Sequence, residues 1–359
     1  KKKDVLLDDF SYEDDDGVSF FSSMLASDEG DAEMQSMQRL FWDALMDALQ
    51  ELPEKQRNVF VWNELEDMTL QEIADRENEN IKTIRPLKDG VIADFQSAEQ
   101  MIRGMIKMIN PGRSLFNPTL RMVICIPSGI TEVEKRAVRD SAEHAGAKEV
   151  YLIHEPMAAA IGIGIDVEEP MGNMIIDIGG GTSEIAVIAL GGIVCDKSIR
   201  IAGDDFTNDI EEYMRRQHNI LVGERTAEQI KIEVGAALPE LDNPPPDYAV
   251  RGRDLMTGIP KEIVVTYSEV AHALDKTISK IEEAILSALE MTPPELSADI
   301  YDNGIHLTGG GALLKGLDKR LHQKTKLPIH IAEDPLRAVV RGTGTALKNI
   351  NNFRTVLMT

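Results

Sequence analysis

The sequence predicts a two-domain α/β protein that is preceded by a small all-α segment of the helix-turn-helix kind. Strands and helices alternate over residues 120–163 and again over residues 305–349, as they do in βαβ units with a mainly parallel sheet. Between these stretches, glycine turns join three apolar runs, which indicates an antiparallel meander. Ahead of them the charge and the periodicity both change, which indicates a separate segment.

The acidic charge is concentrated at the start of the chain. The 359 residues carry a net charge of -23, and residues 1–78 alone hold 7 basic and 21 acidic side chains. This shift in composition suggests a boundary near residue 78. The 43% of apolar residues can bury one large or two ordinary cores, whereas the acidic balance makes the chain a poor partner for nucleic-acid phosphates.

The first segment reads as helical after an acidic start. Residues 1–35 are acidic with interspersed Ser and Gly, and we expect them to be disordered. Apolar residues recur at helical spacing over residues 37–50, and a helix that starts at Pro53 is followed after a short break by another at Leu70–Arg76. Two short helices around a tight break predict a helix-turn-helix-like domain over residues 36–84.

Two further domains are expected at residues 85–165 and 166–350, with a tail at residues 351–359. In the first we expect helices at Phe95–Ile109, Thr131–Ala145 and Met157–Ile163, and strands at Leu120–Pro127 and Glu149–His154. In the second, the run MIIDIGGGTSEIAVIALGGIVCDKSIRI predicts the meander and Tyr248–Tyr267 a strand pair. The remaining predicted elements are helices at Asp204–Gln217, Thr226–Ala237, Ser268–Glu290, Leu313–Thr325 and Pro335–Asn349, and strands at Ile305–Thr308 and Pro328–Ala332.

A glycine-rich turn, Asp177-Ile-Gly-Gly-Gly-Thr182, joins two apolar strands. Glycines there let the backbone approach a phosphate and offer N–H groups to its oxygens, and Asp177 at the strand end can hold a metal ion through water. An ordinary glycine hairpin explains the run equally well. No Lys follows and no helix begins directly after it, so it is neither a Walker loop nor a Rossmann fingerprint.

A second glycine run, Thr308-Gly-Gly-Gly-Ala312, follows another apolar strand, and here a helix is expected to start at Leu313. A helix amino terminus suits the polar groups of a nucleotide. We place the two glycine runs on separate sheets that face one cleft. Two such sites are less expected by chance than either one alone, so together they favour a nucleotide-binding function.

Two helices rich in small residues follow strand ends, at His154-Glu-Pro-Met-Ala-Ala-Ala-Ile-Gly162 and between Asp334 and Ala346. Small side chains allow two helices to cross closely, as a hinge between domains requires, although plain helix packing explains the alanines better. Glu155 differs. A carboxylate just beyond a strand and beside a glycine phosphate loop can orient water.

Cys125 and Cys195 both lie in apolar runs, and the seven histidines are scattered. We therefore expect reduced core cysteines of a cytosolic protein rather than a disulfide or a metal site. No apolar run reaches the roughly 18–20 residues of a membrane span, and no signal peptide is visible. The chain begins at Lys1 rather than Met, so we expect that a true start is missing.

The segments EPMAAAIG, DIGGGTSE, AGDDF, ERTAEQIK, LTGGGALLKGL and AEDPLRAVVRGTG occur in this order within residues 79–350. In this combination the chain resembles the MreB family within the actin and heat-shock ATPase superfamily. The resemblance implies a two-domain actin-like ATPase fold of the ribonuclease H-like kind. It also implies ATP or GTP with Mg²⁺, and at most a slow ATPase activity that is linked to filament turnover.

The resemblance also implies roles for particular residues. Asp177 would hold Mg²⁺ through water, and Glu155 would polarise the attacking water with Thr182 nearby. Other residues would contact the nucleotide: Gly179, Gly180, Gly181 and Thr182 the β- and γ-phosphates, Gly203 and Asp204 a loop near the phosphates, Gly309, Gly310 and Gly311 the adenosine, and Glu228 and Lys231 the base and ribose.

Partners and a cellular place are implied as well. Such a protein would form homopolymer filaments, be cytoplasmic and peripheral at the inner face of the bacterial cell membrane, and direct rod shape together with cell-wall synthesis and morphogenesis proteins. Leu115 and Phe116 beside Arg113 fit this, because a hydrophobic pair near a cation suits shallow insertion into an anionic bilayer. Without the resemblance, a loop tucked against the domain is the better interpretation.

One part of the family pattern is missing. The family starts with a strand–turn–strand that bears an Asp-x-Gly-Thr phosphate loop, followed by a small outer subdomain. Asp16-Gly-Val-Ser19 shares some residues with this motif. However, it lies in an acidic run, and we expect it to be a solvated loop. We therefore expect a truncated first domain that lacks three strands and one phosphate clamp, with impaired function.

Residues 37–84 instead resemble region 4 of an extracytoplasmic-function sigma factor, in LQELPEKQRNVFVWNELEDMTLQEIAD. A chimera joined within residues 79–84, which suit both families, is the simplest explanation. The alternative function is a transcription protein that binds DNA or RNA polymerase, although Pro86 stops the recognition helix. A sugar kinase of the same superfamily would need a catalytic Asp in the first domain, and no candidate is found.

Overall fold

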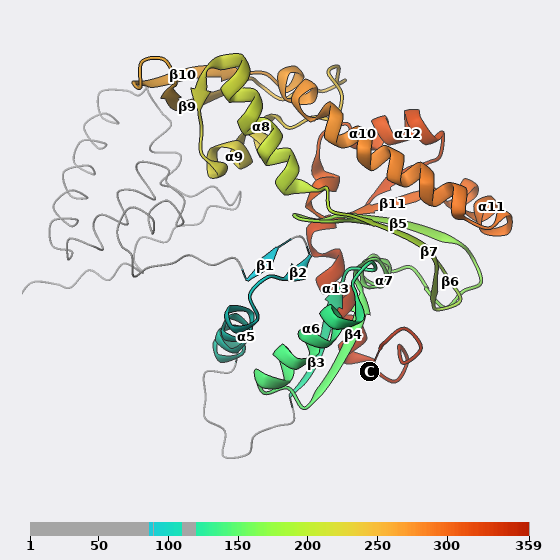
Figure 1. Cartoon of the computed structure of the whole chain (residues 1–359). Helices are drawn as coiled ribbons and strands as arrows, with labels where there is room; N and C mark the ends of the chain where they lie inside the picture. Colours follow the sequence, from blue (N-terminus) through green and yellow to red (C-terminus); the bar gives the residue numbers. More distant parts are fainter. Residues whose placement is uncertain (1–85, 89, 110–119, 359) are drawn as a thin grey trace, which may run out of the picture. The chain divides into compact units, whose positions relative to one another are not determined.

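The computed structural model describes residues 86–88, 90–109 and 120–358, drawn as the coloured ribbon in Figure 1. Contacts divide the chain into two units, residues 1–79 and 80–359, so all described residues belong to the second. The disordered start and the helix-turn-helix predicted within residues 1–84 lie outside the described residues.

A five-stranded sheet forms the centre of the described part, in the order β12-β11-β5-β6-β7. Its strands are β5 (Asn173–Ile178), β6 (Ser183–Ala189), β7 (Gly192–Ile199), β11 (Ile305–Thr308) and β12 (Ile329–Ile331). The first three form the predicted antiparallel meander, whereas β11 runs parallel to both β5 and β12. All residues of β5 and β6 are buried, as expected for central strands that are covered on both faces.

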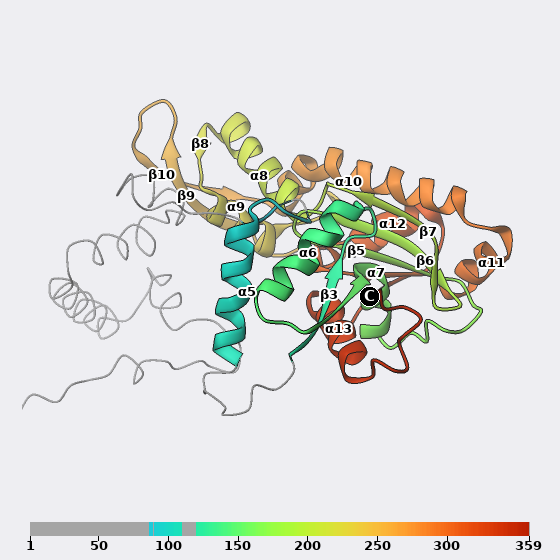
Figure 2. The ribbon, with the colours of Figure 1, turned by 60° about the horizontal axis from the view of Figure 1, so that its bottom comes forward.

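Helices cover both faces of this sheet (Figures 1 and 2). Because side chains alternate along a strand, Ile176 and Ile178 of β5 point into one core and Ile175 points into the other. The first core includes α10 (Tyr267–Met291) and α12 (Leu317–Thr325), and the second includes α7 (Glu155–Gly162) and α13 (Ala338–Lys348). The sheet is thus the middle of three layers.

A separate parallel pair of strands precedes the central sheet in sequence. It consists of β3 (Arg121–Ile126) and β4 (Glu149–His154), joined by α6 (Glu132–His144). A capping box between Thr131 and Glu134 fixes the start of α6. Upstream lie the predicted helix α5 (Phe95–Ile109) and an unpredicted hairpin of β1 (Leu87–Lys88) and β2 (Val91–Ile92).

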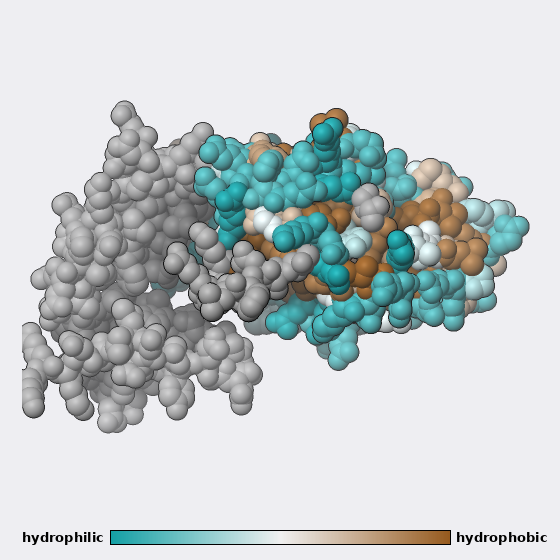
Figure 3. Space-filling model, turned by 90° about the horizontal axis from the view of Figure 1, so that it is seen from below, coloured by the Kyte–Doolittle hydropathy of each residue, from teal (hydrophilic) through white to brown (hydrophobic). Residues whose placement is uncertain are grey.

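The outer edge of β3 has no strand partner among the described residues, because β4 is the only described strand that pairs with it. The other edge of β4 is bridged at Leu152, which exchanges two backbone hydrogen bonds of 2.9 Å with Met358. Seen from below, the described surface shows a band of apolar residues between hydrophilic margins (Figure 3). The outer edge of β3, which has no partner among the described strands, can accept a further strand.

Helices α7 and α13 cross in close backbone contact. A Cβ atom at Gly162 would stand 1.9 Å from the carbonyl oxygen of Ala338, and one at Gly342 would stand 1.7 Å from that of Ala158. Only glycine fits at either position. The predicted close crossing of these two small-residue helices is therefore confirmed.

A smaller module follows β7. It consists of α8 (Gly203–His218), β8 (Ile220–Leu221), α9 (Glu224–Val234), β9 (Tyr248–Asp254) and β10 (Pro260–Val265). The strands form an antiparallel sheet in the order β10-β9-β8, and α8 and α9 pack against its strands β8 and β9. Both helices and the hairpin were predicted, whereas the two-residue β8 was not.

The helix predicted at Leu313–Thr325 is wrong at its start. A short 3-10 helix, η3, occupies Gly310–Leu313, and α12 begins only at Leu317, because Gly316 adopts a left-handed conformation with φ of +76° that interrupts the helix. The helix predicted at Pro335–Asn349 likewise divides into η4 (Pro335–Arg337) and α13. The unpredicted α11 spans Pro294–Asn303 and starts with proline at its first position.

Candidate nucleotide site

Asp177 lies near the end of β5, buried beside the neighbouring strand β11. Its carboxylate accepts a hydrogen bond of 2.8 Å from the Thr308 hydroxyl, because the parallel register places these two residues opposite each other. Burial raises the pKa of Asp177 to about 6, with a smaller rise from the charge of Glu184 and an opposing effect of the Thr308 hydrogen bond. A poorly solvated carboxylate of this kind is stabilised by a nearby cation.

The turn between β5 and β6 presents backbone amides to the surface. The Gly179 amide donates to the Thr182 carbonyl over 2.9 Å and closes the turn. Within residues 120–358, the amides of Gly180 and Gly181 have no hydrogen-bond acceptor, and Gly180 is exposed. Amides of this kind in a tight turn suit an anion such as a phosphate.

The first turn of α8 lies against this glycine turn. The amides of Gly203 and Asp204 donate to the carbonyls of Gly179 and Gly180 over 3.0 and 2.8 Å. A Cβ atom at Gly203 would stand 3.1 Å from the Gly179 oxygen, so glycine allows the close approach. The positive end of the helix dipole is thereby held beside the turn that presents the amides.

Glu228 and Lys231 of α9 are held at the same helix start. The Lys231 ammonium donates to the Gly203 carbonyl over 2.9 Å and forms an ion pair of 2.6 Å with Glu228, one helical turn away. The Thr207 hydroxyl of α8 donates to the Glu228 carboxylate over 2.7 Å. The structure therefore brings six of the predicted residues into one contact network: Gly179, Gly180, Gly203, Asp204, Glu228 and Lys231.

The second glycine run lies on the strand next to the first, so the prediction of two separate sheets is wrong. The reason is that β11 adds in parallel directly beside β5. Cβ atoms at Gly309 and Gly311 would stand 2.3 and 2.2 Å from atoms of Ile178, so both glycines are required by contact with the end of β5. Gly310 between them is partly exposed. The two glycine turns thus form one surface at the carboxyl ends of β5 and β11, where ligands of α/β sheets bind.

Glu155 and Glu184 complete an acidic cluster with Asp177. Glu155 is the first residue of α7, and Glu184 is fully buried on β6, where it accepts hydrogen bonds from Ser128 and Ser198. Burial, with the charges of Asp177 and Glu184, raises the pKa of Glu155 to about 8. The cluster therefore favours a bound proton.

Thr182 lies against the hairpin that precedes α5. A Cβ atom at Gly90, which has φ of +76°, would stand 2.9 Å from the Thr182 methyl group and 3.0 Å from Pro127. The turn of the β1–β2 hairpin is therefore packed onto one side of the glycine turn. The motifs in the sequence gave no indication of this contact.

The residues beside the glycine turn are compatible with a magnesium site. The described residues contain no group of three or more His, Cys, Asp or Glu side chains that could hold a metal ion. Mg²⁺ commonly keeps several waters and binds through one or two carboxylates and the phosphates of its nucleotide. The buried carboxylate of Asp177 close to the glycine turn matches that chemistry.

Glu184 belongs to this acidic cluster but was not among the predicted site residues. Glu184 stands opposite Asp177 in the antiparallel register of β5 and β6, and the glycine turn that joins the two apolar runs was the available signal for this pairing. Thr308 was visible as the start of the second glycine run, but its contact with Asp177 depends on the register of β11, which no local pattern encodes.

The remaining predictions concern the two cysteines, the Leu115–Phe116 pair and membrane-spanning helices. Cys125 and Cys195 are free and partly buried, and burial raises the pKa of the Cys125 thiol to about 11, which keeps it protonated at neutral pH. Leu115 and Phe116 lie outside the described residues. No helix in the described ranges combines the length and the apolar character needed to cross a membrane.

The acidic cluster makes a prediction for stability. The folded chain binds protons at Glu155 and Asp177 more tightly than the unfolded chain does, so this contribution to stability is complete below about pH 4 and is lost as pH rises to about 8. As pH rises from 6 to 9, the unfolding free energy of the wild type should fall. That of Glu155→Gln should fall by less, and the difference between the two falls should be on the order of 2 kcal/mol.

Urea unfolding of the nucleotide-free chain at several pH values measures this difference. Glu143→Gln, an exposed substitution on α6, is the control and should follow the wild type. Identical pH profiles for Glu155→Gln and the wild type would show that Glu155 titrates in the folded protein as it does in the unfolded one.

The central sheet lies between two layers of helices. Two glycine turns follow its adjacent strands β5 and β11, and the start of α8 packs against one of these turns. This arrangement defines an actin-like ATPase fold. The family comparisons agree, since the family model described as MreB/Mbl protein matches residues 67–355. The chain belongs to the MreB/Mbl family.

Relatives within this family are cell shape-determining proteins. The MreB protein of Escherichia coli strain K12 is 49% identical over 272 residues, which cover 76% of this chain and 78% of the relative. The Mbl protein of Bacillus subtilis strain 168 is 48% identical over 274 residues, covering 76% and 81%. This family membership favours the cytoskeletal function over the DNA-binding alternative.

Solved structures show the same fold. MreB5 of Spiroplasma citri bound to ADP has a TM-score of 0.73 and 37% identity, with 78% of this chain and 83% of that chain covered. A MamK double helical filament has a TM-score of 0.62 at 22% identity, covering 73% and 80%, and this likeness concerns the fold alone.

Residues 42–85 match a second family, described as Sigma-70, region 4. The two matched ranges overlap over residues 67–85, which include the string at 79–84 that suits both families. The comparisons thus support the chimeric organisation. The sigma-like match lies outside the described residues.

Proposed function

We propose that this chain is an ATP-binding cytoskeletal protein, in which nucleotide binding and slow hydrolysis control assembly into filaments. The observation that carries the proposal is the single surface formed by the two glycine turns, the start of α8 and the carboxylate of Asp177. Phosphates on this surface would meet the positive end of a helix dipole and the amides of Gly180 and Gly181, which have no other acceptor within residues 120–358. The structures of the Spiroplasma citri protein with ADP and AMPPNP support an adenine nucleotide, and GTP is the alternative.

Each side of the surface has a proposed part of the nucleotide. The turn at Gly179–Thr182, which includes Gly180 and Gly181, faces the β- and γ-phosphates, and Gly203 and Asp204 lie next to it. The run Gly309–Gly311 faces the adenosine. Glu228 and Lys231 bracket the base and ribose, and their attachment to the Gly203 carbonyl supports this assignment because it places them at the same helix start.

Asp177 would hold Mg²⁺ through water, next to the phosphates. When bound, Mg²⁺ would neutralise negative charge on the phosphate oxygens. Glu155 accepts the proton of the attacking water or orients it, with Thr182 nearby. The raised pKa of Glu155 fits a group that takes up a proton near neutral pH, since a base is most effective when its pKa lies near the working pH.

The proposed partners follow from the family. They are further copies of the chain in a filament, the inner face of the bacterial cell membrane, and the proteins of cell-wall synthesis and morphogenesis. The names of the Escherichia coli and Bacillus subtilis relatives as cell shape-determining proteins support this choice.

Isothermal titration of the full chain with ATP and Mg²⁺ tests nucleotide binding. We expect a dissociation constant weaker than about 1 µM, because only one of the family's two phosphate loops is found in the sequence. Gly180→Ala should weaken binding at least about 10-fold, since its methyl group would enter the space that a phosphate needs.

Gly344→Ala is the matched control, because a Cβ atom there meets no atom within 4 Å. Its affinity should equal that of the wild type. A wild-type chain that binds neither ATP nor GTP would contradict the proposal. Sub-micromolar affinity would mean that another segment supplies the second phosphate loop.

Membrane contact is proposed to depend on Leu115 and Phe116. Changing both to serine should abolish co-sedimentation with anionic vesicles, because shallow insertion requires apolar side chains. Val133→Ser removes an apolar side chain with 79% exposure from α6 and should leave pelleting unchanged. Equal pelleting of the double variant and the wild type would place the contact elsewhere.

A further inference from the structure

Two histidines stand opposite each other on the adjacent parallel strands β11 and β12. His306 pairs with His330 in the register of these strands, and the centroids of their imidazole rings are 5.4 Å apart, with the ring planes inclined by 34°. Residues that are paired across two strands have their side chains on the same face of the sheet. The fold therefore brings together two of the seven histidines that are scattered along the sequence.

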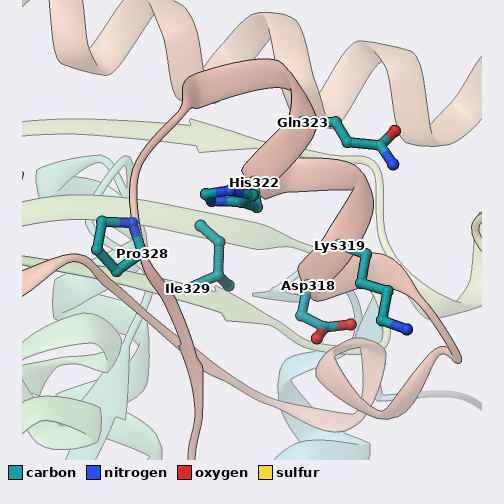
Figure 4. Close-up of a pocket in the computed structure, with 6 residues that line it drawn as sticks. All are labelled: Asp318, Lys319, His322, Gln323, Pro328 and Ile329. Atoms are coloured by element: carbon teal, nitrogen blue, oxygen red, sulfur yellow. The ribbon is translucent and has the colours of Figure 1, made fainter.

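The histidine pair lies on the face of the sheet that is opposite α12. Both neighbours of His306 in β11 belong to the core that includes α10 and α12, so His306 points to the other face. On β12, Ile329 lines a hollow together with His322 of α12 (Figure 4), so the next residue, His330, also points away from α12. His322 is therefore on the other face of the sheet from the pair.

A glycine provides the space for the ring of His330. A Cβ atom at Gly304, which directly precedes β11, would stand 3.0 Å from the Nε2 atom of His330 and 2.5 Å from the carbonyl oxygen of Pro328. Gly304 also has φ of +76°, which other residues rarely adopt. The Nε2 atom of His330 thus reaches toward β11 over a position that has no side chain.

The ring of His306 is in the form that binds metal ions. It is half-buried, and burial, with a smaller effect of the charge that His330 can carry, lowers the pKa of His306 and keeps its imidazole neutral at neutral pH. No hydrogen bond joins either ring of the pair to another described residue. Neutral imidazole is a common ligand of zinc and copper, because its unprotonated nitrogen offers a lone pair.

The spacing of the two rings suits Zn²⁺. Zinc binds histidine nitrogen at about 2.0–2.1 Å, so two such nitrogens on one ion lie roughly 3–4 Å apart. Rings with centroids 5.4 Å apart reach this separation when one nitrogen of each turns toward the other by rotation about the side-chain bonds. The described residues contain no group of three or more such ligands, so water would fill the other positions of a tetrahedral ion.

We propose that His306 and His330 form a two-histidine zinc site that fastens the edge strand β12 to β11. Strand β12 has only three residues, and β11 is its only partner among the described strands. The chain after β12 leads to Pro335, whose carbonyl accepts a hydrogen bond of 2.9 Å from the amide of Gly309 in the second glycine run. A zinc ion across the two strands would therefore stabilise the framework behind this run. Its nitrogen ligands distinguish the site from the proposed magnesium site at Asp177, because Mg²⁺ prefers oxygen.

Isothermal titration of the metal-free full chain with ZnCl₂, in the presence of excess Mg²⁺ to occupy oxygen sites, tests the proposal. We expect one zinc site with a dissociation constant on the order of 1–100 µM, since only two side chains bind the ion. His306→Gln and His330→Gln should each weaken zinc binding at least about 10-fold, because each removes one nitrogen ligand. His330 is exposed, so His330→Gln should fold as the wild type does even if His306→Gln does not.

His322→Gln is the matched control. His322 lies on the other face of the sheet, and its Nδ1 atom is 2.7 Å from the Leu327 carbonyl oxygen, so the control should bind zinc as the wild type does. Zinc should also raise the midpoint of thermal unfolding of the wild type and of the control, but not that of His330→Gln.

Electron paramagnetic resonance with Cu²⁺ as the probe should report two imidazole nitrogens in the wild type and one in His330→Gln. Equal zinc affinities of the wild type and His330→Gln would overturn the inference. A wild type that binds zinc no more tightly than about 1 mM would overturn it too, and the two rings would then be a packing pair only. Neither result bears on the proposed nucleotide binding, which involves other residues.

Discussion

Changing Glu155 to glutamine should slow ATP hydrolysis by at least about 100-fold, while the affinity for ATP changes by less than about threefold. Glutamine keeps the shape of the side chain at the start of α7 but cannot take up a proton from water. Orienting the attacking water matters only in the transition state, so ground-state binding should be preserved. Single-turnover hydrolysis and isothermal titration on the same preparation measure the two effects.

The pH dependence gives a second readout of the same group. With a pKa of about 8, Glu155 is mainly protonated at neutral pH, so hydrolysis by the wild type should rise as pH increases toward 8. This rise should be absent in Glu155→Gln and present in Glu143→Gln. Loss of binding in parallel with hydrolysis would reject the assigned role, because it would show that Glu155 supports the site rather than the reaction.

Changing Gly342 to valine should destabilise the fold by more than about 3 kcal/mol. A Cβ atom there would stand 1.7 Å from the carbonyl oxygen of Ala158 and 2.9 Å from the Gly162 nitrogen, and these are backbone atoms that cannot rotate away. Helices α7 and α13 would have to separate and open the core that they share. Urea unfolding followed by circular dichroism should show a midpoint well below that of the wild type.

Gly344→Val, two residues along the same helix, is the matched control. A Cβ atom there meets nothing within 4 Å, and valine favours a helix slightly more than glycine does. Its midpoint should equal or slightly exceed that of the wild type. A Gly342→Val midpoint that matches the control would show that the two helices do not cross at Gly342.

Local patterns predicted most elements of the described residues closely. The helix at Phe95–Ile109 and the strands at Glu149–His154 and Ile305–Thr308 have the predicted bounds, because apolar periodicity and flanking turn residues mark their ends. The start of α12 was misplaced, since Gly316 could be read as a tolerated helix residue. Only its left-handed conformation, set by the packing around it, reveals the break.

The candidate site was predictable as a set of residues but not as an arrangement. The two glycine runs stood out because they occur together beyond strand ends, and Glu155 stood out because it is a carboxylate at such a position. The pairing of Thr308 with Asp177 joins strands far apart in sequence, and nothing local to either strand specifies it. Glu184 was hidden for a similar reason, because its role depends on Ser128 and Ser198 from two other parts of the chain.

The crossing of α7 and α13 also sets an order of events on the ribosome. At roughly 5–20 residues per second, synthesis reaches the start of α13 about 10–35 s after it has passed the end of α7. During that interval the small-residue face of α7, whose alanines are fully buried in the finished protein, has no helix to cover it. Nascent chains that stop before residue 338 should therefore remain bound to chaperones or be degraded, however well their earlier strands have formed.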